Sequence, residues 1–249
     1  MILRNKLETF GEYTMILREV FRKPGRWRMF FRELRREMYS LGVDSLWIVL
    51  VISFFIGSVI TIQLGINMSS PLIPKFTIGF TAREVILLEF SSTIMGLILA
   101  GKVGSSIASE IGTMRVTEQI DAMDIMGVNS ANYLILPKIM GLMLMIPFLV
   151  ILSMFIGIGG GYMACTLSGD VPPSEFVRGI QFNFNTFYVF YSIIKAVVYA
   201  FLITSIAAYY GYTVKGGALQ VGKASTKAVV SSSISILVAD LILTQLLLV

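Results

Sequence analysis

The chain has 249 residues, of which 55% are hydrophobic and only 14% charged, and its mean hydropathy is +0.80. Soluble domains of this size are less apolar, so the composition predicts a one-domain integral membrane protein. The chain has no histidine and a single cysteine, Cys165, which excludes an intramolecular disulfide, a multi-cysteine zinc site and the commonest general base. In so apolar a chain, the net charge of +5 indicates membrane topology and headgroup contacts rather than nucleic-acid binding.

The first 40 residues are rich in arginine and have a helical period. Apolar side chains recur at helical spacing at Trp27, Phe30, Phe31, Leu34, Met38 and Leu41. A basic helix with an aromatic face is typical of the membrane interface, although a helix packed on other protein would have the same pattern. We predict an interfacial amphipathic helical segment over 1–40 and a transmembrane domain over 41–249. The long basic stretch before a full-length span does not fit a signal peptide.

Five apolar stretches are long enough to cross a bilayer as helices. They are Leu46–Ile66, Val85–Ala108, a part of Ile139–Gly169, Thr186–Tyr210 and Ala228–Leu248. The sequence therefore predicts an all-α integral membrane protein, with an N-terminal interfacial amphipathic helix plus about five transmembrane helices. Of the 20 lysines and arginines, 16 lie in the N-terminal tail and in the loops 102–138 and 211–227. The positive-inside rule then predicts a cytoplasmic N-terminus and a C-terminus on the outer side.

Two short motifs lie inside predicted spans. Residues 96–102 match the first seven positions of a P-loop, but the eighth, which should be Ser or Thr, is Val103. No strand can precede this segment in a membrane span, so we expect any ATP and Mg to be bound by a separate subunit. Gly157 and Gly161 have the G-x-x-x-G spacing that permits close helix contact, either within one chain or between chains.

Four charged residues, Glu89, Lys102, Lys195 and Asp240, lie inside predicted spans, where a charge is costly unless it is paired or hydrated. Glu89 and Lys195 lie at similar depths from the outer side and have opposite charges. They could line a cavity for a polar headgroup, or they could form an ion pair that only fixes helix packing. Asp240 lies about halfway along the fifth span with no partner evident in the sequence, and we favour a hydrogen-bonded packing role for it.

The polar segment 109–127 separates the second and third spans. Val116, Ile120 and Met123 fall on one face of a short helix, and Gly127 is suited to cap its C-terminus. A short cytoplasmic helix between spans could dock on a partner as a coupling helix. It could equally be a simple connection, and the periodicity alone does not decide between these alternatives.

The run Leu99–Gly127, LAGKVGSSIASEIGTMRVTEQIDAMDIMG, closely resembles the signature region of the MlaE (YrbE) permease family. Ile194–Val198, Lys223–Ser233 and Asp240 also resemble that family. The resemblance covers about residues 45–249. The family usually has an arginine before the glutamate that Glu89 matches, whereas this chain has Leu88 at that position.

The resemblance implies the permease subunit of an ABC-type phospholipid transporter in the bacterial inner membrane, without catalytic or metal-binding residues of its own. Two copies would pair as a homodimer, a cytoplasmic ABC ATPase would supply the energy, and a periplasmic MCE-domain protein would exchange phospholipid with the dimer. The residues implied for the ATPase-coupling helix, at about Glu110–Met123, are Glu110, Gly112, Arg115, Glu118, Gln119 and Asp121. The residues implied for the lipid cavity are Glu89 and Lys195.

Three other functions fit parts of the sequence. An ion-coupled secondary transporter would use Glu89 and Asp240 as proton or sodium sites, and it would need no ATPase. A membrane enzyme acting on lipids would need a nucleophile with a base or a metal site, and the absence of histidine disfavours it. A structural anchor for a larger complex would tolerate the loss of charge at Glu89 and Lys195.

Overall fold

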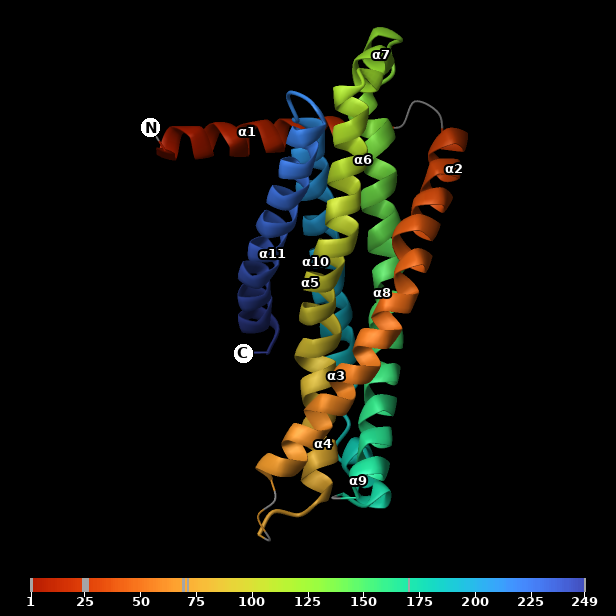
Figure 1. Ribbon diagram of the computed structural model, residues 1–249, viewed down its shortest axis with the longest axis vertical. Helices are drawn as coiled ribbons and strands as arrows, with labels where there is room; N and C mark the ends of the chain where they lie inside the picture. Colours follow the sequence, from red (N-terminus) through yellow and green to blue (C-terminus); the bar gives the residue numbers. More distant parts are fainter. Residues whose placement is uncertain (1, 24–26, 69, 71, 170, 249) are drawn as a thin grey trace. The chain divides into compact units, whose positions relative to one another are not determined.

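The computed structural model describes residues 2–23, 27–68, 70, 72–169 and 171–248, with side chains from residue 11 onward. Throughout these residues the regular structure is helical (Figure 1). The helices are α1 (Ile2–Val20), α2 (Trp27–Glu37), η1 (Met38–Gly42), η2 (Val43–Ser45), α3 (Leu46–Asn67), α4 (Phe76–Val85), η3 (Ile86–Ile94), α5 (Met95–Leu99), η4 (Ala100–Gly104), α6 (Ser105–Val116), α7 (Gln119–Ile125), α8 (Ser130–Ser168), α9 (Pro173–Gln181), α10 (Phe187–Tyr212) and α11 (Ala218–Leu248). The predicted all-α fold is confirmed.

Five helical runs in the described residues are long and apolar enough to cross a membrane. They are Trp27–Asn67, Phe76–Val116, Ser130–Ser168, Phe187–Tyr212 and Ala218–Leu248. Each coincides with one of the five predicted spans and extends beyond it at one end or both, and only Thr186, at the start of the predicted fourth span, falls outside its run. The extension is expected because a helix continues into polar residues until its backbone is capped or broken, whereas hydropathy marks only the part that suits hydrocarbon.

The N-terminal segment differs from the single amphipathic stretch that the sequence indicated. The structure divides it into α1 and α2, and α2 continues through η1 and η2 into the first span. Leu34 and Leu41 are buried, whereas Trp27 and Phe31 are exposed. The apolar face of α2 is therefore partly packed on protein, and its position in the membrane interface stays a prediction.

The chain forms two compact units. The first unit comprises residues 1–43, 96–145 and 198–242, and the second comprises 44–95, 146–197 and 243–249. Every segment predicted to be cytoplasmic contributes to the first unit, and the connections predicted on the outer side contribute to the second.

In the first unit, polar contacts tie α1 to the spans. The Tyr13 hydroxyl donates to Ser205 Oγ at 2.8 Å, and the Tyr209 hydroxyl donates to the Glu12 carboxylate at 3.1 Å. The side-chain amide of Asn132 donates to the carbonyls of Val20, at the end of α1, and of Arg22, at 2.6 and 2.7 Å. These bonds satisfy carbonyl groups that the end of a helix leaves without partners.

In the second unit, glycines bring α3 and α8 into close contact. A Cβ atom on Gly57 would lie 2.0 Å from the Gly157 carbonyl oxygen, and one on Gly160 would lie 2.2 Å from the Phe54 carbonyl oxygen. The Ser58 hydroxyl also donates to the Gly160 carbonyl at 2.9 Å. The glycine-rich part of α8 therefore serves close helix packing within one chain, as small residues do in membrane proteins.

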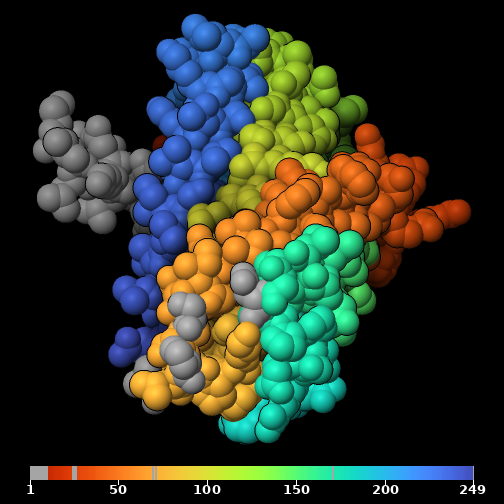
Figure 2. All heavy atoms as spheres, turned by 60° about the horizontal axis from the view of Figure 1, so that its bottom comes forward, coloured from red at the N-terminus to blue at the C-terminus, as the bar shows by residue number. Residues whose placement is uncertain are grey.

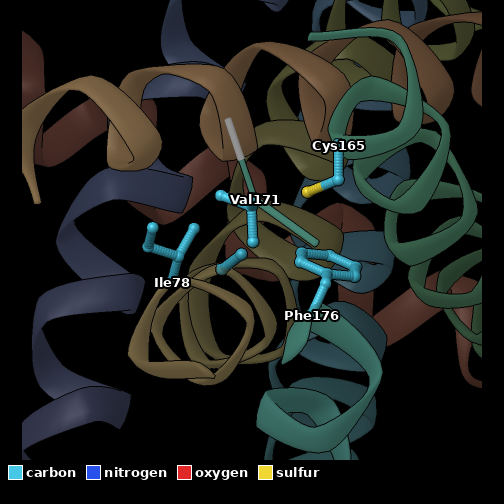
Figure 3. Packing of buried hydrophobic residues seen from close by; sticks show 5 residues of the cluster. Ile78, Cys165, Val171 and Phe176 are labelled. Carbon is cyan, nitrogen blue, oxygen red and sulfur yellow. The ribbon is translucent and has the colours of Figure 1, made fainter. Parts of the chain in front are cut away.

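In the second unit α4 also packs against α9, and the two lie within the adjoining gold and teal surfaces of Figure 2. A small apolar cluster lies beside this contact, formed by Ile78, Ala82, Cys165, Val171 and Phe176 (Figure 3). Cys165 is 2% exposed and packs in this cluster as a small apolar residue.

Candidate functional site

Glu89 lies on a widened part of the second span. Residues 86–94 form the π-helix η3, which follows α4 without a break. Short π-helical turns inside α-helices occur frequently at functional sites. No sequence pattern indicated this widened turn.

The structure brings Glu89 and Lys195 together. Lys195 Nζ lies 3.2 Å from both carboxylate oxygens of Glu89. The lysine side chain is fully buried, whereas that of Glu89 is 46% exposed. A buried ammonium group needs a paired charge and further hydrogen bonds. Glu89 supplies the charge, and Lys195 donates further hydrogen bonds to the Tyr191 hydroxyl at 3.1 Å and the Leu88 carbonyl at 3.4 Å.

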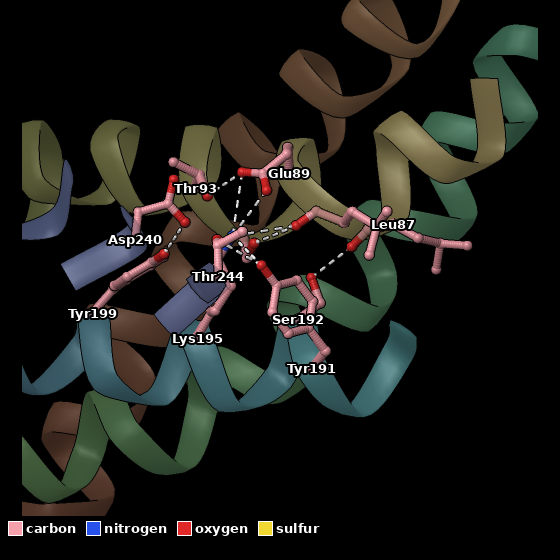
Figure 4. Close-up of polar contacts among 11 residues, drawn as sticks. Leu87, Glu89, Thr93, Tyr191, Ser192, Lys195, Tyr199, Asp240 and Thr244 are labelled. Carbon is pink, nitrogen blue, oxygen red and sulfur yellow. Dashed lines mark hydrogen bonds and ion pairs between the residues drawn. The ribbon is translucent and has the colours of Figure 1, made fainter. Parts of the chain in front are cut away.

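Hydroxyl groups complete this charge pair (Figure 4). The Thr93 hydroxyl donates to Glu89 at 3.1 Å, and the Tyr191 and Thr244 hydroxyls share a hydrogen bond at 2.8 Å. The ammonium group of Lys195 also lies 4.8 Å from the centroid of the Tyr191 ring, in the range of a cation–π contact. The pair is therefore fixed on the lysine side and open on the carboxylate side.

This geometry favours binding over chemistry. Lys195 is enclosed by its partners, so the accessible group is a carboxylate whose charge is already neutralised. Such a group can accept hydrogen bonds from a polar ligand without placing an uncompensated charge in the membrane. Among the residues that the structure describes, no three His, Cys, Asp or Glu side chains converge on a position that could hold a metal ion.

Asp240, for which the sequence offered no partner, accepts a hydrogen bond from the Tyr199 hydroxyl at 2.7 Å (Figure 4). Tyr199 is fully buried, and Asp240 is half-buried. The contact joins α10 to α11 within the first unit. It fits the packing role that we favoured for Asp240.

The predicted coupling segment does not form one short helix. The run that contains the second span continues through α6 to Val116, and α7 begins only at Gln119. Between them, Glu118 has φ of 60°, in the left-handed region that non-glycine residues adopt at a cost. A short helix between the second and third spans is therefore present as α7, but its bounds differ from the expected Glu110–Met123. Hydrophobic spacing continues across the break at Glu118 and does not reveal where one helix ends and the next begins.

The predicted cap at Gly127 is present. The amide of Gly127 donates to the Asp124 carbonyl, and the amide of Val128 donates to the Met123 carbonyl, both at 3.0 Å. This pair of bonds, with Gly127 at φ of 74°, is a Schellman motif. The turn carries Ile125 and Met126, which are 88% and 71% exposed. These two apolar side chains, which the sequence analysis did not single out, form the exposed tip of α7.

The six residues implied for the coupling helix differ in exposure. Glu118, Gln119 and Asp121 are exposed. Arg115 is half-buried and pairs with Asp121 at 2.6 Å, which braces α7 against α6. Gly112 is buried, and a Cβ atom there would lie 3.1 Å from Val221.

Glu110, the last of the six, leads to an ion cluster that the sequence did not predict. Lys138 Nζ lies 2.8 Å from the Glu110 carboxylate and 2.7 Å from that of Glu37. The lysine side chain is 3% exposed, and the three residues join α6, α8 and α2. In the sequence, Lys138 counted only as a positive charge beside the third span. The one feature of the sequence that could have indicated its burial is its position immediately before a charge-free apolar run.

Arg83 is a second buried ion. Its guanidinium group donates to the carbonyls of Ile180 and Phe182, at 2.7 and 2.8 Å, and pairs with Glu84. The Phe80 ring packs against it, with 4.9 Å between the guanidinium carbon and the ring centroid. Arg83 therefore fastens the end of α9 to α4.

Comparison with known proteins identifies relatives along most of the chain. The model of the family described as "Permease MlaE" matches residues 34–246. A probable ABC transporter permease protein of Rickettsia bellii is 35% identical over 222 residues, covering 88% of this chain and 84% of that protein.

Two further relatives come from photosynthetic organisms. A probable ABC transporter permease protein of Synechocystis is 34% identical over 220 residues, covering 87% of this chain and 82% of that protein. The chloroplastic protein TRIGALACTOSYLDIACYLGLYCEROL 1 of Arabidopsis thaliana is 31% identical over 235 residues, covering 88% of this chain and 61% of that protein.

Proposed function

The chain belongs to the MlaE permease family, and on that premise we propose that it moves phospholipid between the inner membrane and a periplasmic MCE-domain protein. It is a multi-pass permease of the ABC-transporter type, which implies an ATPase partner. In this proposal the chain binds no cofactor of its own, and ATP and Mg are bound by the ATPase subunit.

The observation that carries the lipid assignment is the open carboxylate of Glu89 beside the buried Lys195. A neutralised, partly exposed ion pair inside a span can hydrogen-bond the polar headgroup of a lipid that passes through the membrane at this depth. An ion-conducting site would instead need the carboxylate free to bind the ion. The name of the Arabidopsis relative is built on that of a diacylglycerol lipid, which agrees with a lipid substrate.

The half-exposed carboxylate also supports a homodimer. A single chain leaves 46% of the Glu89 side chain uncovered, although a charge in a span is costly unless protein or water surrounds it. A second copy of the chain placed over Glu89 would supply that cover. The lipid cavity would then lie between the two copies.

The exposed tip of α7 supports the ATPase contact. Ile125 and Met126 are apolar and exposed, whereas the Arg115–Asp121 pair and the cap at Gly127 hold the tip in a fixed shape. A rigid apolar projection flanked by charges can enter a pocket on a partner as an anchor. We assign this surface to the ATPase and place it in the cytoplasm, with the C-terminus in the periplasm.

The proposed mechanism depends on the continuous helical run that connects Glu89 to the segment before α7. The helical run Phe76–Val116 carries Glu89 and ends immediately before α7. ATP binding changes the ATPase dimer, and α7 carries the movement into that run. Phospholipid is released or captured because its affinity for the cavity differs between the two states, as any ligand-coupled shift requires.

Purification from the native membrane in mild detergent, followed by mass spectrometry, tests the proposal. We expect an ATPase subunit, an MCE-domain protein and phospholipid to remain bound. A cysteine at Ile125 should crosslink to the ATPase, whereas one at the 92% exposed Leu72 should not. The native Cys165 is buried and should not compete.

Recovery of the chain alone and lipid-free, with no ATPase crosslinked through Ile125, would overturn the proposal. Uptake driven by an ion gradient without any ATPase would favour the ion-coupled alternative.

A further inference from the structure

A polar cavity lies within the first unit, where α10 and α11 meet. Its volume is about 480 Å³. The residues that line it are Tyr209, Tyr210, Thr213, Val214, Lys215, Gln220, Lys223, Ala224 and Lys227. None of them belongs to the Glu89–Lys195 site or to the tip of α7, so the proposed transport function leaves this cavity unassigned.

The charge of the cavity is strongly one-sided. Lys215, Lys223 and Lys227 are exposed, and no described carboxylate forms an ion pair with any of them. Glu12, which lies beside the lining residue Tyr209, accepts a hydrogen bond from the Tyr209 hydroxyl. Three ammonium groups around one cavity repel one another, so the cavity favours an anionic ligand.

The other polar groups in the lining determine what kind of anion fits. The Tyr210 hydroxyl is already shared with Ser231, and the Thr213 hydroxyl donates to the Tyr209 carbonyl. The lysine ammonium groups therefore remain as the main free donors, with the exposed amide of Gln220 beside them. A phosphate group, with several acceptor oxygens and full negative charge, matches such a set of donors.

The position of the cavity indicates a membrane depth. α10 ends at Tyr212 and α11 begins at Ala218, and both helices are candidate spans. The cavity therefore lies where two spans leave the hydrocarbon, which is the level of lipid headgroups. Lysine and tyrosine side chains are typical of that level.

The surface of α11 supplies a path for an acyl chain. Lys223, Lys227, Val230 and Ile234 are spaced by four, three and four residues and therefore share one helix face. Val230 and Ile234 are 53% and 58% exposed. This face offers a charged site followed by an apolar stripe leading into the span, the same order as headgroup and tail in a phospholipid.

We propose that this cavity binds the phosphate of an anionic phospholipid, with the three lysines on the headgroup and the acyl chain along α11. Free phosphate shares the headgroup chemistry but has no use for the apolar stripe. The bound lipid is a resident of the leaflet at this end of the first unit, and it is distinct from the lipid in the Glu89–Lys195 cavity.

The test uses the purified, delipidated full chain in a neutral detergent and three soluble probes. These are dihexanoylphosphatidylglycerol, dihexanoylphosphatidylcholine and inorganic phosphate. Binding is measured as the increase of the thermal midpoint with probe concentration, which reports ligand affinity by mass action. We expect saturable stabilisation by the phosphatidylglycerol probe and much weaker responses to the other two.

Variants assign the binding to the cavity. Each lysine near a membrane surface contributes roughly fivefold in affinity, so K215Q/K223Q/K227Q should weaken phosphatidylglycerol binding by roughly 100-fold. The arginine variant K215R/K223R/K227R should keep it. A control that removes three charges elsewhere, R28Q/R32Q/R35Q on α2, should change it by less than about fivefold. If the triple glutamine variant fails to fold, K227Q alone should still weaken binding by roughly fivefold.

Unchanged phosphatidylglycerol binding in the lysine-to-glutamine variants would overturn the proposal, as would an equal loss in the α2 control. Equal affinity for inorganic phosphate would overturn the assignment to a lipid, and equal affinity for phosphatidylcholine would overturn the requirement for an anion.

Discussion

Replacing Lys138 with methionine should destabilise the protein by roughly 3–5 kcal/mol, the typical cost of removing one partner from a buried ion pair. Methionine is close to lysine in length and apolar, so little packing is lost. The change removes the positive charge from between Glu37 and Glu110, which lie 2.7 and 2.8 Å from the lysine nitrogen. Two carboxylates are then left facing each other across the position of the lost ammonium group.

The exposure of each partner sets the order of the effects. Glu37 is 13% exposed and Glu110 is 43% exposed, so water can compensate Glu110 but hardly Glu37. We expect K138M to be the most damaging change. E37Q should cost about 2 kcal/mol, since an amide can still accept from the lysine but without charge assistance. E110Q should cost about 1 kcal/mol or less, as for a solvent-exposed pair.

The assay is the thermal midpoint of the purified protein in detergent. In a chain of this size 1 kcal/mol corresponds to roughly 2–4 °C, so K138M should lower the midpoint by on the order of 10 °C. The double variant K138M/E37Q removes both buried charges and should recover part of the loss.

Two results would refute this reasoning. A midpoint of K138M within about 2 °C of the wild type would mean that the cluster is solvated and weak. An additive loss in K138M/E37Q would mean that Lys138 and Glu37 are not energetically coupled.

Three further changes test other parts of the structure. Gly160→Ala should destabilise the protein by roughly 2–4 kcal/mol because its Cβ would lie 2.2 Å from the Phe54 carbonyl oxygen. The control Gly159→Ala, whose Cβ would have nothing within 4 Å, should be neutral or slightly stabilising. Thermal midpoints compare the two variants, and equal losses would contradict the close α3–α8 contact. Glu118→Gly should raise stability by up to about 1 kcal/mol because glycine adopts the left-handed backbone without strain, and a loss of stability in the same measurement would contradict the observed break. Glu89→Gln should lower the amount of co-purifying phospholipid, counted per chain by mass spectrometry, and unchanged lipid content in the folded variant would argue for a purely structural pair. The double variant Glu89→Gln/Lys195→Met should be more stable than Lys195→Met alone, because the single change leaves the carboxylate without its lysine.

Local chemistry determined several features of the site in advance. Glu89 and Lys195 could be proposed as partners because each interrupts an apolar span at a similar depth with opposite charge. The cap at Gly127 could be predicted because glycine favours the backbone that ends a helix. Depth along a span and helix capping both depend on residues close in sequence, so one sequence is enough to derive them.

Other features of the site required the folded chain. Lys138 meets Glu37 and Glu110, which are 101 and 28 residues away, and no local pattern links them. The π-helix around Glu89 and the left-handed backbone at Glu118 occur inside stretches whose hydrophobic spacing is regular. Each of these depends on how helices rotate and pack against one another rather than on what each helix contains.

The sequence by itself therefore determined the membrane spans, because hydrocarbon selects apolar length directly and backbone bonds must close within each helix. It also determined the resemblance that leads to the permease family. Tertiary structure decided which charges meet, which carboxylate stays open, and which apolar residues form the tip of α7. Those outcomes depend on the register between helices distant in sequence, and that register is set by packing contacts that hydropathy does not encode.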